Sequence, residues 1–237
     1  SFLKWTGAFA TSIDESSWFI LLFLLELETY VLSDETLEGP TRWIILAIRI
    51  PCYIFLVHTL YAFGDTVYDL SQVTPIAGIT ELCQLVASNV SYVENLKYTL
   101  LDFNNCANLS SASQFFYTEP GLVVTDSNGL AVERHLAWLD LIEAFVWICI
   151  LFTIGLMVWL QDRGITKGSL MRIIIIAKVA LYSVLWGAAG YWIFKGHYYF
   201  AWDEFIWISG FFFIEMNVAD WREEINEVDA AKLMSTT

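Results

Sequence analysis

The feature that most constrains this chain is a series of apolar segments, each about as long as a membrane-spanning helix. A bilayer core of roughly 30 Å is crossed by about 20 mostly apolar residues in a helix, with a range of about 17–25. Five segments fit, and they run over residues 17–32, 42–63, 136–160, 170–194 and 202–220. The third and fourth are apolar around their whole circumference, which disfavours a soluble helical protein with a very hydrophobic core. The sequence therefore predicts an all-α polytopic membrane protein with about five transmembrane helices.

The composition supports a protein whose main partner is the lipid bilayer. Hydrophobic residues make up 57% and charged residues 16% of the chain, and the mean hydropathy is +0.55. Soluble domains hold roughly 45–50% apolar and about 25% charged residues. The formal net charge of -14 comes mostly from acids at segment ends and in one long polar stretch. This acidic balance makes nucleic acid a poor partner, because binding to phosphates needs clustered Lys and Arg.

The link between the third and fourth segments sets the expected orientation. Arg163, Lys167 and Arg172 form the densest basic cluster in the chain, and the positive-inside rule puts it in the cytoplasm. Alternation then places residues 64–135 outside and the tail from Trp221 inside. We expect an integral protein of a bacterial inner membrane or of a eukaryotic plasma membrane or endomembrane. The first segment is short and carries two carboxylates, so a half-helix or interfacial helix stays an alternative to a full span.

The long polar stretch between the second and third segments predicts a folded extracytoplasmic cap. The chain then divides into a pair of membrane helices, the cap, a three-helix membrane segment and a cytoplasmic tail, at 1–63, 64–135, 136–220 and 221–237. Cys83 and Cys106 both lie in the cap, so we expect a disulfide in an oxidising compartment, with two free thiols as the alternative. Apolar residues at helical spacing over 79–100 predict amphipathic helices. Two β-prone runs around Asn128-Gly129 predict a hairpin.

No enzyme or cofactor signature occurs in the sequence. It has no phosphate-binding Gly loop, no Gly-x-Ser-x-Gly and no His-Glu-x-x-His. The three histidines, His58, His135 and His197, are far apart and show no metal-ligand spacing. Only His58 lies within an expected span, which excludes haem ligation by pairs of histidines. We therefore expect no catalytic activity, no cofactor and no metal site.

Ionisable residues inside the apolar segments are the first candidates for function. Each costs a few kcal/mol at the bilayer centre, so each must face a partner or water. At a rise of about 1.5 Å per residue, two cations and three carboxylates share the cytoplasmic third of the membrane: Glu26, Glu28, Arg49, Lys178 and Glu215. They form either an ion-paired network that fixes helix packing or a path for protons or cations.

A second level of charge is expected at the external third. It is formed by Asp65, Asp140, Glu143, Asp203 and Glu204, and it stays net negative after pairing with nearby cations. Rings of Asp and Glu at a pore mouth concentrate cations. The alternative is a set of solvated helix ends, with the acids of the last segment favoured by the positive end of a helix dipole.

The last segment carries both levels on one face. Glu204, Ile208, Phe211 and Glu215 fall along one helical stripe. A stripe with acids at each end and an apolar middle is typical of a gated pore lining. It is equally typical of a helix face that packs against its neighbours.

Two function classes follow from these patterns. The first is ion translocation by a cation channel or transporter that uses intramembrane carboxylates, with monovalent or divalent cations as cargo. The second is a non-catalytic accessory or structural subunit of a larger membrane complex, which the lack of cofactor motifs favours. Small residues at 187–190 would let helices approach closely, within the chain, in a homo-oligomer or against other membrane subunits.

Overall fold

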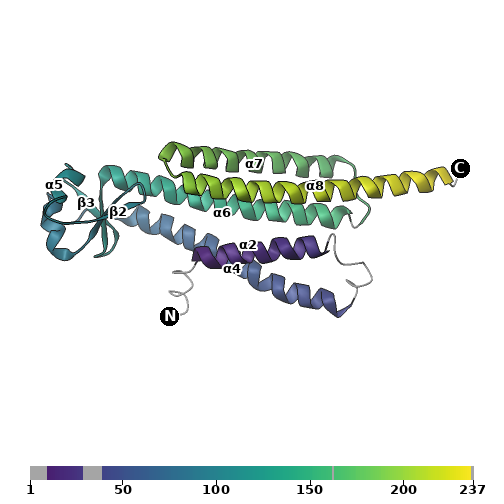
Figure 1. The fold of residues 1–237 in the computed structure, drawn as a ribbon, viewed down its shortest axis with the longest axis horizontal. Coiled ribbons are helices and arrows are strands. Elements are labelled where there is room, and N and C mark those ends of the chain that lie inside the picture. Colours follow the sequence, from purple (N-terminus) through teal and green to yellow (C-terminus); the bar gives the residue numbers. More distant parts are fainter. Residues whose placement is uncertain (1–9, 29–38, 162, 236–237) are drawn as a thin grey trace. The chain divides into compact units, whose positions relative to one another are not determined.

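The computed structural model describes residues 10–28, 39–161 and 163–235, and within them the chain is mostly helical (Figure 1). The helices are α2 (Ala10–Glu26), α4 (Pro40–Gln72), the 3-10 helix η2 (Leu82–Ser88), α5 (Cys106–Leu109), α6 (Ser127–Gln161), α7 (Ser169–Lys195) and α8 (Tyr198–Ser235). The strands are β1 (Ser91–Glu94), β2 (Lys97–Leu100), β3 (Phe115–Glu119) and β4 (Val123–Asp126). The expectation of an all-α fold is therefore wrong in one respect, because the chain contains a small sheet.

The chain forms two compact units. Unit 1 comprises Ser1–Leu60 and Glu143–Thr237, and unit 2 comprises Tyr61–Ile142. The described part of unit 1 is helical and includes α2, α7 and α8 with the first part of α4 and most of α6. Unit 2 contains the sheet, the short helices and the remaining turns of α4 and α6.

Three of the described helices, α4, α6 and α7, are long and apolar enough to cross a membrane. The helices α2 and α8, which correspond to the first and last expected segments, are not among them. The described part of α2 has 17 residues, and residues 29–32 of its expected span lie outside the described residues. In α8 the apolar stretch is bracketed and interrupted by carboxylates. Five spans therefore stay a prediction, while three membrane-length helices are a finding.

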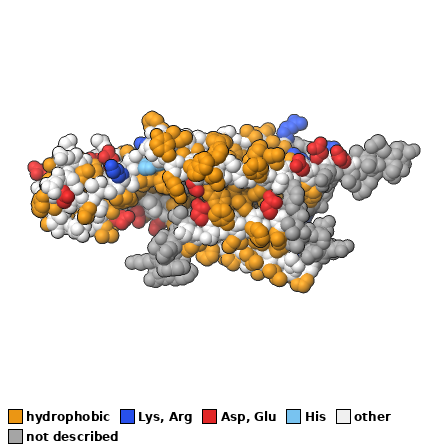
Figure 2. Space-filling model, viewed as in Figure 1, with side chains coloured by type: hydrophobic (Ala, Val, Ile, Leu, Met, Phe, Trp, Pro, Cys, Tyr) orange, Lys and Arg blue, Asp and Glu red, His pale blue; other side chains and the backbone are white. Residues whose placement is uncertain are grey.

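Unit 1 exposes large hydrophobic side chains on its helices, as a lipid-facing protein does. On the face drawn in Figure 2, hydrophobic side chains cover much of the surface. The exposed large hydrophobic residues of this unit include Phe19, Phe152, Ile173, Phe194, Trp202 and Phe213. Exposed apolar patches of this extent are rare on soluble monomers.

Aromatic rings form the centre of unit 1. Trp18 of α2, Trp147 of α6 and Phe211 of α8 are buried and contact one another. Their ring centroids lie 6.1 Å (Trp18–Trp147), 5.8 Å (Trp18–Phe211) and 4.9 Å (Trp147–Phe211) apart. Such pairs add roughly 0.5–1.5 kcal/mol each beyond their burial, so the three helices are held together at this depth.

A glycine sets the turn between α7 and α8. Gly196 caps α7 in the left-handed conformation (φ 84°), and its backbone N–H donates to the carbonyl oxygens of Ile193 and Trp192. Any other residue would be strained at this φ. The turn lets α8 begin at Tyr198 and run antiparallel to α7 at its side (Figure 1).

The sheet of unit 2 has the strand order β2-β1-β4-β3. The outer pairs, β1–β2 and β3–β4, are antiparallel, and the central pair, β1–β4, is parallel. A buried cluster beneath the sheet includes Tyr92, Phe115 and Val124 together with the disulfide residue Cys106. The expected Cys83–Cys106 disulfide is confirmed, and it joins η2 to α5 with the two Cα atoms 4.9 Å apart.

The prediction of amphipathic helices over residues 79–100 is wrong. This stretch forms the 3-10 helix η2 and then the β1–β2 hairpin. Asn89, Asn95 and Leu96 all have positive φ, which ends the helix after one short piece and then turns the chain back. The apolar spacing did not separate the two structures, because β1 has only four residues and its two buried ones, Tyr92 and Val93, are consecutive.

The prediction of a hairpin around Asn128-Gly129 is also wrong, because these residues form the first turn of α6. The observed hairpin of this region joins β3 to β4 through a turn that contains Gly121 (φ 74°). Asp126 explains the difference. Its Oδ1 accepts from the backbone N–H groups of Asn128 and Gly129, each at 2.9 Å, and so caps the start of a helix.

Asp126 also ties the sheet to the neighbouring loop. Its Oδ2 accepts hydrogen bonds from Tyr92 Oη at 3.0 Å and from Ser110 Oγ at 2.5 Å. Burial alone would raise the pKa of Asp126, but the hydrogen bonds from Gly129, Ser110 and Tyr92 outweigh it and hold the pKa below its ordinary value. Burial and the adjacent Asp126 raise the pKa of Tyr92, so its hydroxyl stays a donor at neutral pH.

Replacing this carboxylate should loosen unit 2. We expect Asp126→Asn to destabilise the unit by about 1–3 kcal/mol, because the buried donors lose a charged acceptor. Since the folded pKa is lowered, the stabilisation is complete above the unfolded pKa and is lost as pH falls below about 4. Hydrogen exchange of the strand amides in the full-length protein, followed by mass spectrometry from pH 3 to 7, measures both effects.

The matched control is Glu81→Gln, which removes an exposed carboxylate of the same unit. It should leave exchange of β1 and β4 unchanged. If D126N and E81Q exchange at the same rate as the parent protein, Asp126 does not have the stabilising role described above.

Candidate functional site

Two ion pairs join the helices of unit 1. Arg49 Nη2 of α4 lies 2.5 Å from Glu28 Oε2, and Glu28 stands shortly after the end of α2 at Glu26. Lys178 of α7 pairs with Glu215 of α8. These four residues were expected to share one depth, and the structure brings them together as two separate pairs. The Lys178 Nζ atom also lies 3.7 Å from Met157 Sδ of α6, so this pair contacts three helices.

Glu26, the fifth residue of that predicted set, has a neutral partner. The amide Nδ2 of Asn217 on α8 donates to Glu26 Oε1 at 3.2 Å. Asn217 was missed by the sequence reasoning, although an amide two residues after Glu215 inside an apolar run is itself a signal of a buried polar contact. Together these contacts link α4 to α2, α2 to α8 and α8 to α7, and we refer to them as the ion-pair level.

A groove opens between α7 and α8 beside the Lys178–Glu215 pair, with a volume of about 440 Å³. Tyr182 and Arg222 line it together with apolar side chains. Glu215 Oε2 faces Lys178, whereas Glu215 Oε1 and Tyr182 Oη are buried and have no hydrogen-bond partner among the described residues. Half of the Glu215 carboxylate is therefore available for another group.

Two buried carboxylates accept hydrogen bonds from tryptophan indoles at a second depth of unit 1. Glu143 Oε1 of α6 accepts from Trp192 Nε1 of α7 at 2.9 Å, and Glu204 Oε1 of α8 accepts from Trp147 Nε1 of α6 at 3.2 Å. Both glutamates are only 8% exposed. The sequence reasoning found the two acids but missed their tryptophan partners, which lie on other helices.

The remaining members of the predicted external set are divided between the two units. Asp203 is exposed and adjoins Glu204 on α8. Asp65, exposed on α4, and Asp140, half-buried on α6, belong to unit 2. A single ring of five acids stays a prediction.

Two carboxylates of α2 join this level and were missed. The charge of Glu15 interacts with those of Asp14 and Asp203, and the charge of Glu204 interacts with those of Asp203 and Glu15. Both missed residues precede the apolar run that was expected to begin at Ser17, whereas α2 already begins at Ala10. We call Asp14, Glu15, Glu143, Asp203 and Glu204 the carboxylate level.

The predicted stripe of α8 faces the interior of unit 1. Glu204, Ile208 and Phe211 are 8%, 5% and 0% exposed, and the Glu215 side chain is 17% exposed. Ile208 and Phe211 belong to the aromatic core, so the two carboxylates are separated by densely packed apolar side chains. Trp207, on the same helix, is partly buried and packs against this core.

Comparison with known protein families, curated proteins and solved structures gives no match. The candidate site is therefore defined by its own chemistry. Within the described residues, no three His, Cys, Asp or Glu side chains are arranged to hold a metal ion.

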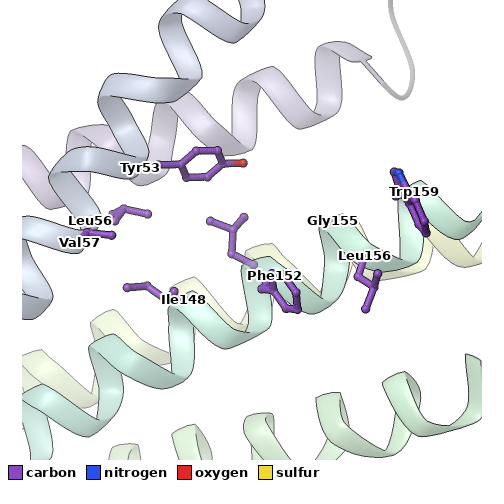
Figure 3. Close-up of a pocket in the computed structure, with 9 residues that line it drawn as sticks. Tyr53, Leu56, Val57, Ile148, Phe152, Gly155, Leu156 and Trp159 are labelled. Carbon is purple, nitrogen blue, oxygen red and sulfur yellow. The ribbon is translucent and has the colours of Figure 1, made fainter. Parts of the chain in front are cut away.

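A second groove of unit 1 is apolar and has a volume of about 520 Å³ (Figure 3). It lies between α4 and α6. The lining residues are Tyr53, Leu56, Val57, Ile148, Leu151, Phe152, Gly155, Leu156 and Trp159. Figure 3 shows the Tyr53 ring extending from α4 into the space between the two helices. The lining holds no charged side chain, and its polar side-chain groups are the Tyr53 hydroxyl and the Trp159 indole N–H.

Breaking the ion pair between α7 and α8 should destabilise unit 1 more than removing it altogether. We expect Lys178→Met to lower the free energy of unfolding by about 3–5 kcal/mol, because one buried charge then lacks its partner. The double variant K178M/E215M should lose far less, since both charges are gone. Thermal unfolding in detergent, arranged as a double-mutant cycle, gives the coupling energy.

Arg172→Gln serves as the control, since Arg172 is an exposed cation at the start of α7. Its melting temperature should match that of the parent protein. Equal losses for K178M and R172Q, or additive losses in the cycle, would show that the pair does not stabilise the bundle.

Proposed function

We propose that this chain is an integral membrane protein that translocates cations along the inward face of α8. The observation that carries the proposal is the state of the two carboxylates on that face. Glu204 and Glu215 each direct one oxygen to a donor, and Glu204 Oε2 and Glu215 Oε1 are buried without a partner among the described residues. A buried carboxylate oxygen without a donor is costly, so each of these positions favours binding of a cation or a proton.

The orientation follows from the basic link and from five spans, with α2 and α8 crossing the bilayer alongside α4, α6 and α7. The carboxylate level then lies towards the external surface and the ion-pair level towards the cytoplasm. Unit 2 is the extracytoplasmic cap, which agrees with its disulfide. Glu204 and Glu215 are separated by about 16 Å at a rise of about 1.5 Å per residue.

The aromatic core between the two carboxylates supports a gated route. Trp18, Trp147, Ile208 and Phe211 fill the space between them, and a hydrophobic constriction of this kind excludes water and ions. Passage therefore requires these side chains to move. A transporter or a closed channel fits this arrangement better than a permanently open pore.

One observation favours a second function, a structural subunit of a larger membrane complex. Four charges of the ion-pair level are neutralised within the chain, through Arg49–Glu28 and Lys178–Glu215. Internal pairing of this kind fixes helix packing and needs no transported ion. The two functions differ in whether the purified chain passes cations by itself.

Cation flux in liposomes tests the proposal. Protein reconstituted with a potassium gradient should change the signal of a potential-sensitive dye, and Glu204→Gln should reduce the rate by about ten-fold or more, because it removes the charge at the buried site. Phe211→Ala should increase the rate, because it shortens the aromatic constriction. Glu223→Gln, which removes an exposed carboxylate near the end of α8, is the control and should match the parent.

A rate equal to that of protein-free liposomes for the parent and for F211A would exclude translocation by this chain. Recovery of the chain in a fixed ratio with another membrane protein would then support the structural subunit. Flux that is equal in the parent and E204Q would exclude Glu204 from the route.

A further inference from the structure

Two cations of the groove between α7 and α8 contact the same sulfur atom. Lys178 Nζ lies 3.7 Å from Met157 Sδ, and Arg222 Nη1 lies 4.0 Å from it. Lys178 is paired with Glu215, whereas Arg222 forms no ion pair among the described residues. The three charged side chains that line the groove are therefore two cations and one carboxylate. Neighbouring cations repel each other, so an anion bound beside them would be stabilising.

Two oxygen atoms in the same groove lack a hydrogen-bond partner. Tyr182 Oη and Glu215 Oε1 are buried and unpartnered among the described residues, and both side chains line the groove. The carboxylate oxygen needs a donor, which an anionic group cannot supply. A hydroxyl group both donates and accepts, so a ligand hydroxyl can donate to Glu215 and accept from Tyr182. The groove therefore favours a ligand that carries a hydroxyl as well as an anion.

The groove changes from cationic to apolar along its length. Because α7 and α8 run antiparallel and are joined at Lys178–Glu215, the lining residues Trp186 and Phe212 lie on one side of this pair. Arg222 follows Glu215 along α8 in the opposite direction. Trp186 and Phe212 are also exposed, so the apolar end opens to the surface of unit 1.

The dimensions of the groove match one leaflet of a bilayer. Ile208 and Arg222, its outermost lining residues on α8, are separated by about 21 Å at a rise of about 1.5 Å per residue. Half of a hydrocarbon core of roughly 30 Å is about 15 Å. The volume of about 440 Å³ lies in the range of small-molecule sites, roughly 300–1,000 Å³.

We propose that this groove binds an anionic lysophospholipid, in which glycerol carries one acyl chain, one phosphate and one free hydroxyl. The phosphate bonds the Arg222 guanidinium and the Lys178 ammonium, the hydroxyl bonds Glu215 Oε1 and Tyr182 Oη, and the chain follows the apolar end. Basic pockets between membrane helices bind anionic lipid headgroups in this way. A phospholipid with two chains fits less well, because its second chain esterifies the hydroxyl.

The inference goes beyond cation translocation and affects it at one atom. The lipid hydroxyl and a transported cation would compete for Glu215 Oε1, so bound lipid should slow cation flux. Lipid binding is measured without an ion gradient, so the two proposals fail separately. Absence of flux leaves the lipid site standing, and absence of lipid binding leaves translocation standing.

Native mass spectrometry of the full chain in a nonionic detergent, titrated with oleoyl lysophosphatidate, tests the site. We expect saturable binding of one lipid per chain. The deoxy analogue of this lipid lacks only the free hydroxyl, and it should bind about ten-fold more weakly, because Glu215 loses its donor. Dioleoyl phosphatidate should also bind more weakly, and glycerol phosphate should not displace the lysolipid.

Two variants separate the phosphate contact from the hydroxyl contact. Arg222→Gln should weaken lysophosphatidate binding by about ten-fold, because the phosphate loses a charge-assisted hydrogen bond. Tyr182→Phe removes a hydroxyl that has no partner among the described residues, so the fold should be kept. It should weaken binding of lysophosphatidate several-fold and leave binding of the deoxy analogue unchanged. Arg172→Gln, which removes an exposed cation that does not line the groove, is the control and should bind as the parent does.

Absence of saturable binding, equal binding of the deoxy analogue, or equal losses in R222Q and R172Q overturns the inference. Unchanged binding in both R222Q and Y182F does so as well. Displacement by glycerol phosphate would show a site for a soluble anion, and tighter binding of dioleoyl phosphatidate would show a site for a lipid with two chains. Either result rejects the lysophospholipid.

Discussion

The cost of an unpaired charge in an apolar environment is the constraint on which unit 1 depends. Lys178 and Glu215 each lie within long apolar helices, and neither could be held there without the other. The pair fixes α7 against α8. In the same way, Arg49–Glu28 joins α4 to the end of α2, and Asn217–Glu26 joins α8 to α2. Helix packing between apolar surfaces is weakly directional in lipid, so these few polar contacts define which faces meet.

The two levels of unit 1 use polar groups in different ways. At the ion-pair level two pairs of opposite charges are matched and fix the packing of the helices, while Glu215 Oε1 is buried without a hydrogen-bond partner among the described residues. At the carboxylate level two of the acids accept hydrogen bonds from neutral indole N–H groups, in Glu143–Trp192 and Glu204–Trp147. The first arrangement suits a fixed scaffold, and the second suits a site that accepts positive charge. The aromatic core keeps these environments apart.

How much of this could be predicted from sequence differs between the two units. Length, periodicity and the cost of buried charge were sufficient to find the membrane-length helices and to place Lys178 and Glu215 at one depth. The sheet was missed because the parallel pairing of β1 with β4 joins strands far apart in the chain, and no local pattern encodes it. The hairpin prediction at Asn128-Gly129 failed because Asp126, just before these residues, caps the start of a helix. Asp14 was missed because it precedes the apolar run.

The glycine turn between α7 and α8 has a consequence for how this part of the chain can evolve. Lys178 and Glu215 lie at nearly equal separations before and after Gly196. Adding or removing one residue at the turn would rotate α8 by about 100° and move it about 1.5 Å along its axis. The Glu215–Lys178 ion pair and the hydrogen bond from Trp147 to Glu204 would then be lost together. The length of this turn therefore fixes the register of α8 at both levels. We infer that point substitutions are tolerated there more readily than insertions or deletions.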